Sequence, residues 1–423
     1  MNNYRIKKCK NGVPLIQIPI KGAKTATIMF MFNTGSKYET RNNNGISHFL
    51  EHMFFKGTKK RPDTATISSS LDSLGSEFNA FTSKEYTGYY VKVASNKTKK
   101  ASEIMGDMLL NSVFDEKEIE REKGVIIEEL NMYEDNPLMH IEDVFENCLY
   151  QDSPAGWDTI GTKENIKNFK RSDFIDYFKN QYGSKSLSFI ISGDFSSDDI
   201  KSIENIVNKF PENNWKNKEK VIEEQEKAEI KLEKKNVDQV TLSLGFRTVP
   251  AGNKNQVALK LLSIILGGSM SSRLFIKLRE RNGLAYFVKT STEFYTDSGY
   301  LTTQAGVPIE KAKEAVEIIL NEYSLLKNEL VLEKELKRAK DMYKGRLLLN
   351  MEGSDEVANW YGKQAILNKN KINTPKNFLE ELNKVSASQL KKIANNYFIQ
   401  KNLNLALIGK VEEKEFKKVL KIK

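Results

Sequence analysis

The sequence predicts an α+β protein of two homologous domains, each with a mostly antiparallel sheet packed with helices on one face. Its 423 residues are too many for one compact core. The same order of predicted strands and helices occurs before and after a charged segment, residues 211–233. The closing strands of the two halves, residues 188–195 and 404–411, also resemble each other. We therefore expect an internal duplication, with domains at residues 1–210 and 234–423 joined by a linker.

Alternating apolar residues and turn residues place the elements of the first half. Asp63 begins a predicted helix that stops at Gly75, and another helix stops before Pro137. The predicted strands are residues 12–18, 25–32, 78–82, 86–93 and 186–193. The predicted helices are residues 63–74, 97–110 and 116–134, together with one that follows the loop ending at Gly45.

The second half repeats this arrangement. Its predicted strands are residues 239–246, 285–292, 299–306 and 404–411. Its predicted helices are residues 258–266, 272–281 and 309–326. The helix that follows Gly45 carries histidines, and the second half has none in the matching place. We expect only the first domain to hold a metal ion.

Residues 45–55 form an apolar helix that carries two of the three histidines of the chain. His48 and His52 are four residues apart and share one helix face, and Glu51 lies within about 100° of both. A buried face with two imidazoles and a carboxylate needs a partner that offsets the cost of desolvation. Zinc fits, because both imidazoles can reach one ion at about 2.0–2.1 Å. The alternative is a pair of hydrogen-bonded core histidines, but His-x-x-Glu-His is the inverzincin signature.

Glu51 would then act as the general base that takes a proton from water, while the ion needs a third protein ligand. The candidates are His140, Cys148 and the acids of the helix at residues 116–134. Ile119, Ile126 and Tyr133 repeat every seven residues and mark its buried side. Glu122 and Glu129 lie on that side and Glu128 points to solvent, so one of the first two is a ligand and the other orients one. Periodicity does not decide between them.

Three segments resemble the pitrilysin-type metallopeptidases of family M16, which include insulinase and the mitochondrial processing peptidase. They are residues 45–58, 79–87 and 122–130, and the resemblance covers essentially the full chain. It implies that Glu129, which follows His52 by 77 residues (129 − 52), is the third zinc ligand and that Glu122 supports a ligand. It also implies a processing-peptidase-like fold of the short, two-domain branch, with one zinc ion per chain.

The resemblance further assigns parts to two other regions. Arg279 and Tyr286, seven residues apart (286 − 279), match a pair that stabilises the oxyanion. Residues Asn79, Ala80, Phe81 and Thr82 match an edge strand that pairs with the substrate backbone. His140 is expected to be structural. Family members of this length pair two chains, which implies a homodimer with shared active sites.

Composition narrows the remaining possibilities. The net charge of +10 comes from lysines interleaved with glutamates, so we expect a solvated surface and no nucleic-acid partner. No apolar run is long enough to span a membrane, and the N-terminus shows no signal sequence. Only two cysteines occur, Cys9 and Cys148, which predicts a reducing, cytoplasmic location.

These observations predict a zinc endopeptidase that hydrolyses peptides or unfolded polypeptide segments. Two alternatives stay open. One is a non-catalytic or processing-complex partner subunit of the same family, although such subunits typically lose the zinc motif. The other is a zinc hydrolase of non-peptide substrates, because the motif specifies activation of water and leaves the substrate undefined.

Overall fold

The computed structural model describes residues 4–368 and 372–423, and the chain divides into two compact units. Unit 1 comprises Met1–Leu130, Asp158–Glu219 and Leu347–Thr374. Unit 2 comprises Asn131–Trp157, Lys220–Arg346 and Pro375–Lys423. Each unit therefore includes a segment from the other side of the predicted linker.

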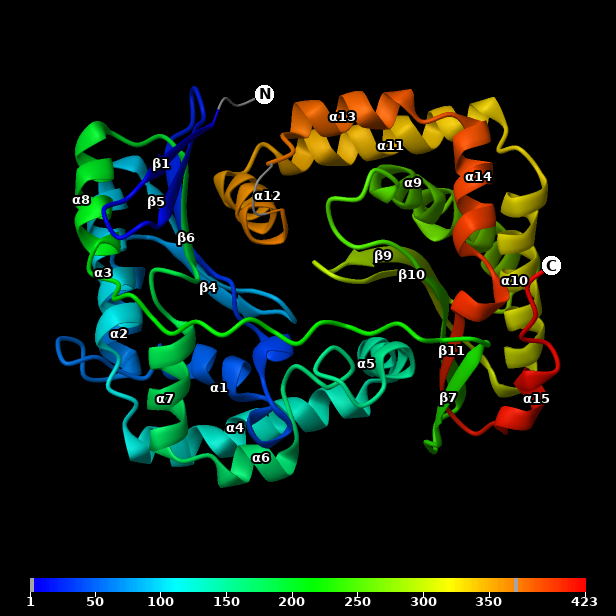
Figure 1. Cartoon of the computed structure of the whole chain (residues 1–423), viewed down its shortest axis with the longest axis horizontal. Coiled ribbons are helices and arrows are strands. Elements are labelled where there is room, and N and C mark those ends of the chain that lie inside the picture. The colour runs from blue at the N-terminus through cyan, green and yellow to red at the C-terminus, as the bar shows by residue number, and fades with distance from the viewer. Residues whose placement is uncertain (1–3, 369–371) are drawn as a thin grey trace. The chain divides into compact units, whose positions relative to one another are not determined.

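Unit 1 is built on a six-stranded sheet with the strand order β1-β2-β6-β3-β5-β4 (Figure 1). Neighbouring strands are antiparallel except β2 and β6, which are parallel. The central strand β3 is buried along nearly its whole length, whereas β4 forms an edge. The strands are β1 (Arg5–Lys8), β2 (Pro14–Pro19), β3 (Thr25–Phe32), β4 (Glu77–Thr82), β5 (Thr87–Ala94) and β6 (Leu187–Gly193).

Unit 2 is built on a five-stranded sheet with the order β7-β11-β8-β10-β9. Only β7 and β11 are parallel neighbours. This is the order β2-β6-β3-β5-β4 of the first sheet, with the strands also in the same chain order, so the predicted fold class is confirmed. The strands are β7 (Glu229–Glu233), β8 (Gln239–Arg247), β9 (Phe287–Phe294), β10 (Gly299–Pro308) and β11 (Leu403–Ile408).

Helices cover both faces of the sheet in unit 1, so the prediction of helices on one face is wrong. The ring of Phe32 packs against Tyr182, at the end of α7, on one face. The helix α12 lies over the other face (Figure 1). There Tyr361 is buried in one cluster with Met29, Met31 and Ile190. The helix that covers this face comes from late in the chain, which the local pattern could not show. The helices are α1 (Ile46–Met53), α2 (Thr64–Asp72), α3 (Thr98–Asn111), α6 (Lys163–Asn168), α7 (Arg171–Gln181), α8 (Ser197–Val207) and α12 (Ser354–Leu367), and α4 (Glu116–Asp135) begins in this unit.

Unit 2 has the same two-sided cover. Phe246 of β8 packs against Tyr323 of α10 on one face, while Phe145 of α5 packs against Tyr300 of β10 on the other. The segment predicted as a helix at residues 272–281 contains a π-helical turn, η4 (Phe275–Arg281). The helices are α5 (Pro137–Tyr150), α9 (Gln256–Gly267), α10 (Ala312–Asn328), α11 (Glu333–Asn350, which ends in unit 1), α13 (Pro375–Lys384), α14 (Ala387–Tyr397) and α15 (Glu413–Lys417).

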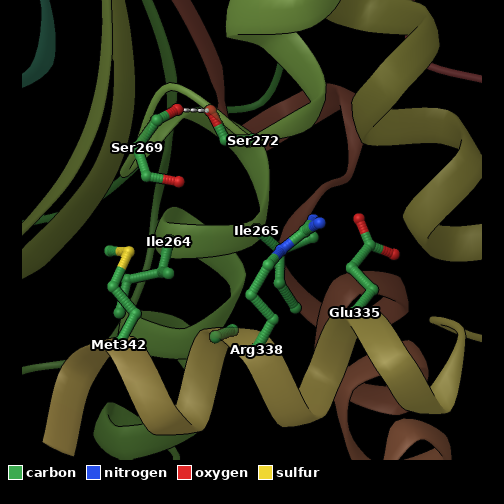
Figure 2. A pocket seen from close by; sticks show the side chains of 8 residues that line it. Ile264, Ile265, Ser269, Ser272, Glu335, Arg338 and Met342 are labelled. Atoms are coloured by element: carbon green, nitrogen blue, oxygen red, sulfur yellow. Dashed lines mark hydrogen bonds between the residues drawn. The ribbon is translucent and has the colours of Figure 1, made fainter. Parts of the chain in front are cut away.

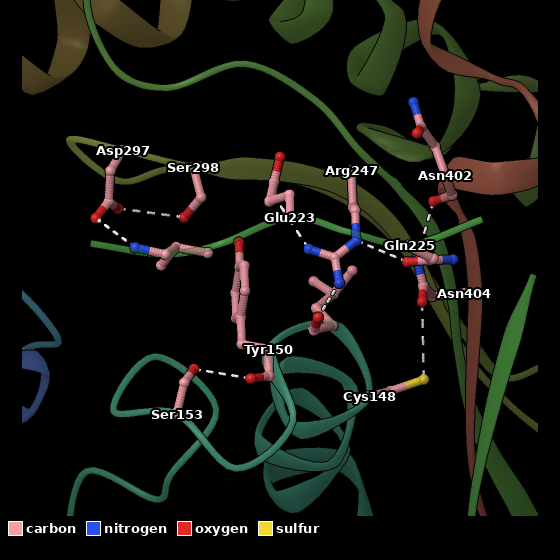
Figure 3. Close-up of polar contacts among 12 residues, drawn as sticks. Cys148, Tyr150, Ser153, Glu223, Gln225, Arg247, Asp297, Ser298, Asn402 and Asn404 are labelled. Carbon is pink, nitrogen blue, oxygen red and sulfur yellow. Dashed lines mark hydrogen bonds and ion pairs between the residues drawn. The ribbon is translucent and has the colours of Figure 1, made fainter. Parts of the chain in front are cut away.

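The segment predicted as a linker is partly ordered structure of unit 2. Its last residues form β7, which adds to the sheet beside β11. Upstream, Arg247 donates to Gln225 Oε1 over 2.6 Å and to Glu223 Oε1 over 3.2 Å (Figure 3). The same guanidinium also donates to the carbonyl of Leu149 and lies 5.5 Å from the ring centre of Tyr150. One buried arginine therefore fixes residues 223–225 to α5 and β8.

The structure also describes the two cysteines and the apolar character of the helices. Cys9 and Cys148 are both buried free thiols, and burial raises the pKa of Cys148 to about 12. Among the described residues, no helix has both the length and the apolar composition that crossing a membrane requires.

Candidate metal centre

The N-terminus of α1 is fixed by a buried carboxylate. Glu39 is 3% exposed and accepts hydrogen bonds of 2.8 Å from the backbone N–H groups of Gly45 and Ser47. Burial raises the pKa of Glu39, and these N–H donors lower it. Gly45 has a φ of 100°, and a Cβ there would lie 2.3 Å from the Ile160 carbonyl oxygen, so only glycine fits before this helix. Glu39 was not predicted from the sequence.

The next two turns of α1 present His48 and His52 to Glu129 of α4. His48 Nε2 lies 3.7 Å from Glu129 Oε1, and His52 Nε2 lies 3.5 Å from Glu129 Oε2. One ligand atom of each residue lies within 4.8 Å of those of the others. Donor atoms at about 2.0–2.1 Å from a tetrahedral ion are separated by about 3.3–3.5 Å, so this cluster fits zinc with little movement. Two imidazoles and one carboxylate also leave a fourth position for water or substrate.

The electrostatics of this cluster favour a positive charge. Burial alone would lower the pKa of His48, but the carboxylates of Glu129 and Glu51 outweigh that effect and raise it. The His48 imidazole, in turn, holds the pKa of Glu129 below its usual range. Nδ1 of His48 is buried and has no hydrogen-bond partner among the described residues. A cation held between His48, His52 and Glu129 would bind the carboxylate and one ring nitrogen of each imidazole.

The helix α4 places its acids as the periodicity predicts. Ile119 and Ile126 are buried, Glu122 is buried, Glu129 is half-buried and Glu128 is exposed. Glu122 Oε1 lies 2.8 Å from His52 Nδ1, on the side of the imidazole away from Glu129. This is the position of an orienting residue and leaves Glu129 as the acid within reach of a shared ion.

Two further contacts complete the surroundings of the cluster. Thr82 donates a hydrogen bond of 2.5 Å to Glu51 Oε2, which ties the predicted general base to the end of β4. Burial raises the pKa of Glu51, and the Thr82 hydroxyl and the two imidazoles lower it. Lys56 Nζ lies 2.5 Å from Glu122 Oε2. Lys56 was missed in the sequence, although it follows His52 by one helical turn.

The residues Asn79, Ala80, Phe81 and Thr82 lie in β4, at the edge of the six-stranded sheet. The strand pairs with β5 in antiparallel register, with Asn79 opposite Tyr90 and Thr82 opposite Thr87. Its other edge has no neighbouring strand in the part of the chain that the structure describes. Because Thr82 bonds to Glu51, this open edge runs directly beside the candidate base.

Arg279 and Tyr286 contact each other in unit 2. Arg279 Nη1 donates over 3.0 Å to the carbonyl of Tyr286, and its guanidinium lies 4.8 Å from the centre of the tyrosine ring. The phenol itself is 82% exposed. An exposed hydroxyl beside a fixed guanidinium is suited to donating hydrogen bonds to a ligand.

The loop that precedes Arg279 is held by α11. Arg338 donates over 3.0 Å to the carbonyl of Ser271, and Ser272 donates over 2.5 Å to the carbonyl of Ser269. A small pocket between α9 and α11 is lined by Arg338, Glu335 and several aliphatic side chains (Figure 2). Its acid is already paired, because Arg273 makes two hydrogen bonds to Glu335.

The other ligand candidates have different surroundings. His140, in α5, places Nε2 2.9 Å from Glu233 of β7, so it joins two elements of unit 2. Cys148 is buried, and its raised pKa keeps it a thiol at neutral pH, whereas zinc binds a thiolate. Neither belongs to the His48–His52–Glu129 cluster.

The family model described as "Insulinase (Peptidase family M16)" matches residues 17–163, and the model described as "Peptidase M16 inactive domain" matches residues 168–343. The first range contains both histidines of the motif and Glu129. The second contains Arg279 and Tyr286.

Several relatives match along nearly the whole chain. YmxG of Bacillus subtilis (strain 168), described as an uncharacterized zinc protease, is 36% identical and the match covers 95% of this chain and 97% of the relative. The β subunit of the mitochondrial-processing peptidase of Bos taurus is 28% identical, with 93% of this chain and 81% of the relative covered. A crystal structure of a protease from Helicobacter pylori has the same fold, with a TM-score of 0.91, 23% identity and coverage of 97% of this chain and 100% of that one.

Two neighbouring glutamates of α4 provide a matched test of the ligand assignment. We expect Glu129→Gln to weaken zinc binding strongly, because it removes a direct ligand. The loss should exceed about 10–100-fold, which is typical when a residue that only hydrogen-bonds to a ligand is removed. Glu128→Gln should leave zinc affinity unchanged, because Glu128 points to solvent. Competition with a chromophoric chelator measures both constants. A loss of affinity in Glu128→Gln alone would show that the assignment is wrong by one residue.

Proposed function

The chain belongs to the insulinase-type peptidases, family M16, and on this premise we propose that it is a zinc-dependent endopeptidase acting on peptides and unfolded polypeptide segments. One observation carries the proposal. Three ligand atoms from His48, His52 and Glu129 lie within 4.8 Å of one another, and Glu51 lies on α1, the helix that carries the two histidines. This separates a metal-binding set from a carboxylate that can move protons.

Zinc held by these three residues would polarise a peptide carbonyl and lower the pKa of a water molecule. The chain's own part is proton transfer. Glu51 takes the proton from the attacking water and later gives it to the leaving amine. The hydroxyl of Thr82 holds the carboxylate in place between the two steps.

The remaining roles rest on family membership together with local geometry. Arg279 and Tyr286 are the proposed oxyanion donors, and their mutual contact keeps guanidinium and phenol together. The open edge of β4 is the proposed substrate strand, because an extended peptide can add to it through backbone hydrogen bonds. Backbone pairing reads few side chains, so we expect loose sequence selectivity. It also requires an extended substrate, which favours unfolded segments over folded proteins.

The proposed assembly is a homodimer whose active sites are shared between the chains, with one zinc ion in each chain.

The proposed location is the cytoplasm, on the basis of two cysteines that stay as thiols. Two other functions are outcomes of the test: a partner subunit of a processing complex, and a zinc hydrolase of non-peptide substrates.

The direct test is digestion of a panel of unfolded proteins and short peptides by the zinc-loaded protein. We expect cleavage that a chelator stops and that added zinc restores. Glu51→Gln should reduce hydrolysis by at least about 10²–10⁴-fold, the usual contribution of a general base, while about one zinc per chain remains bound. The panel is read by mass spectrometry and the metal by elemental analysis.

Each alternative has its own outcome in that experiment. Zinc binding without cleavage of any polypeptide would favour a hydrolase of other substrates. Failure to bind zinc at all would favour a partner subunit. Wild-type cleavage by Glu51→Gln, with its metal content verified, would eliminate the proposed base.

The oxyanion role of unit 2 gives a further prediction. Tyr286→Phe should lower kcat by about 10²–10³-fold, the effect of losing one such donor, with zinc content and folding unchanged. If sites are shared in a dimer, mixing Glu51→Gln chains with Tyr286→Phe chains should restore part of the activity, because a mixed dimer has one site with neither change. Mixtures that exchange subunits and stay inactive would show that each chain completes its own site.

A further inference from the structure

The two histidines of the candidate metal centre are supported in different ways. His48 has a side chain that is 12% exposed, and no hydrogen-bond partner is present for its Nδ1 among the described residues. His52 is 23% exposed, and its Nδ1 lies 2.8 Å from Glu122 Oε1. Packing therefore holds the first ring, whereas the second depends on a hydrogen bond for its orientation.

That hydrogen bond leads to an ion pair behind the ligand. Glu122 Oε2 lies 2.5 Å from Lys56 Nζ, and the side chains of the two residues are 4% and 21% exposed. The two oxygens of one buried carboxylate are thus divided, one facing His52 and one facing Lys56. Lys56 follows α1 by a single turn, which its backbone N–H continues by donating to the Met53 carbonyl over 3.1 Å.

The charge on Lys56 matters because Glu122 is almost fully buried. A buried carboxylate needs a charged or strongly donating partner, and it moves toward one if it has none. The two oxygens of Glu122 meet this need in the structure, because one lies 2.5 Å from the Lys56 ammonium and the other 2.8 Å from His52 Nδ1. Without the ammonium, the oxygens of Glu122 would be free to rotate away from His52 or to draw its ring out of line.

We propose that Lys56 is a positioning residue of the zinc centre. By holding one oxygen of Glu122, it keeps the other on His52 Nδ1, and so keeps His52 Nε2 directed at the position between it and Glu129, 3.5 Å away. Lys56 thereby sets the affinity for zinc without touching the ion. The inference rests on the proposed zinc site but not on its peptidase activity.

The test is a comparison of zinc affinities measured by competition with a chromophoric chelator. Lys56→Met keeps the length of the side chain and removes its charge, and we expect zinc to bind about 10–100-fold more weakly, as for other outer partners of a metal ligand. Lys56→Arg should restore most of the affinity. Lys59→Met is the matched control, because Lys59 is exposed three residues farther on, and its affinity should equal that of the wild type.

A second comparison separates positioning from general stabilisation of the fold. In a Glu122→Gln background, Lys56→Met should cause little further loss of zinc affinity, because Lys56 acts on His52 only through the Glu122 carboxylate. Circular dichroism of each metal-free variant checks folding, and Lys56→Gln serves if Lys56→Met is poorly folded. Wild-type affinity in folded Lys56→Met, or fully additive losses in the double variant, would overturn the proposal.

These outcomes are independent of the proposed peptidase function. A protein that binds zinc through this arrangement but cleaves nothing would contradict the proposed function and leave the role of Lys56 intact. Normal cleavage by the wild type, together with unchanged zinc affinity in Lys56→Met, would contradict the role of Lys56 and leave the proposed function intact.

Discussion

The structure around the candidate site depends on one constraint: two imidazoles on the eight-residue helix α1 must meet a carboxylate from α4 in a largely apolar setting. So short a helix does not hold its own position, and it is fixed at its start and along its apolar side. Glu39 binds the N–H groups at its start, and the ring of Phe49 packs 4.8 Å from Phe174 of α7. The ligand geometry is therefore a consequence of how α1 is packed and capped.

The same site brings several negative charges close together. Glu51, Glu122 and Glu129 all lie near the two imidazoles, and Lys56 is the cation paired with Glu122. Burial makes a charge costly, so each carboxylate needs its own hydrogen-bond donor or cation. Glu122 contacts Lys56 and His52, and Glu51 accepts a hydrogen bond from the Thr82 hydroxyl. Glu129 faces both imidazoles. A divalent cation fits this division, because it would be bound where Glu129 and the imidazoles converge.

Much of this could be predicted from local sequence patterns, and the exceptions share a cause. The strand at residues 25–32, the phase of α4 and the shared face of His48 and His52 follow from periodicity, which reports on neighbours in the chain. The residues predicted as a charged linker include β7 and the segment held by Arg247, whose partners lie far away in sequence. The cover of α12 on the first sheet was missed for the same reason. Lys56 is a different case. Its spacing of one helical turn from His52 is visible in the sequence, but only the contact with Glu122 shows its role.

The central claim is that one zinc ion binds to His48, His52 and Glu129 while Glu51 stays outside the ligand set. Anomalous diffraction at the zinc edge, from crystals of the zinc-loaded protein, tests this most directly. We expect one strong peak per chain, about 2.0–2.2 Å from Nε2 of both histidines and from a carboxylate oxygen of Glu129. A peak bound to Glu51 or Glu122 in place of Glu129, or a zinc ion bound only elsewhere in the chain, would contradict it.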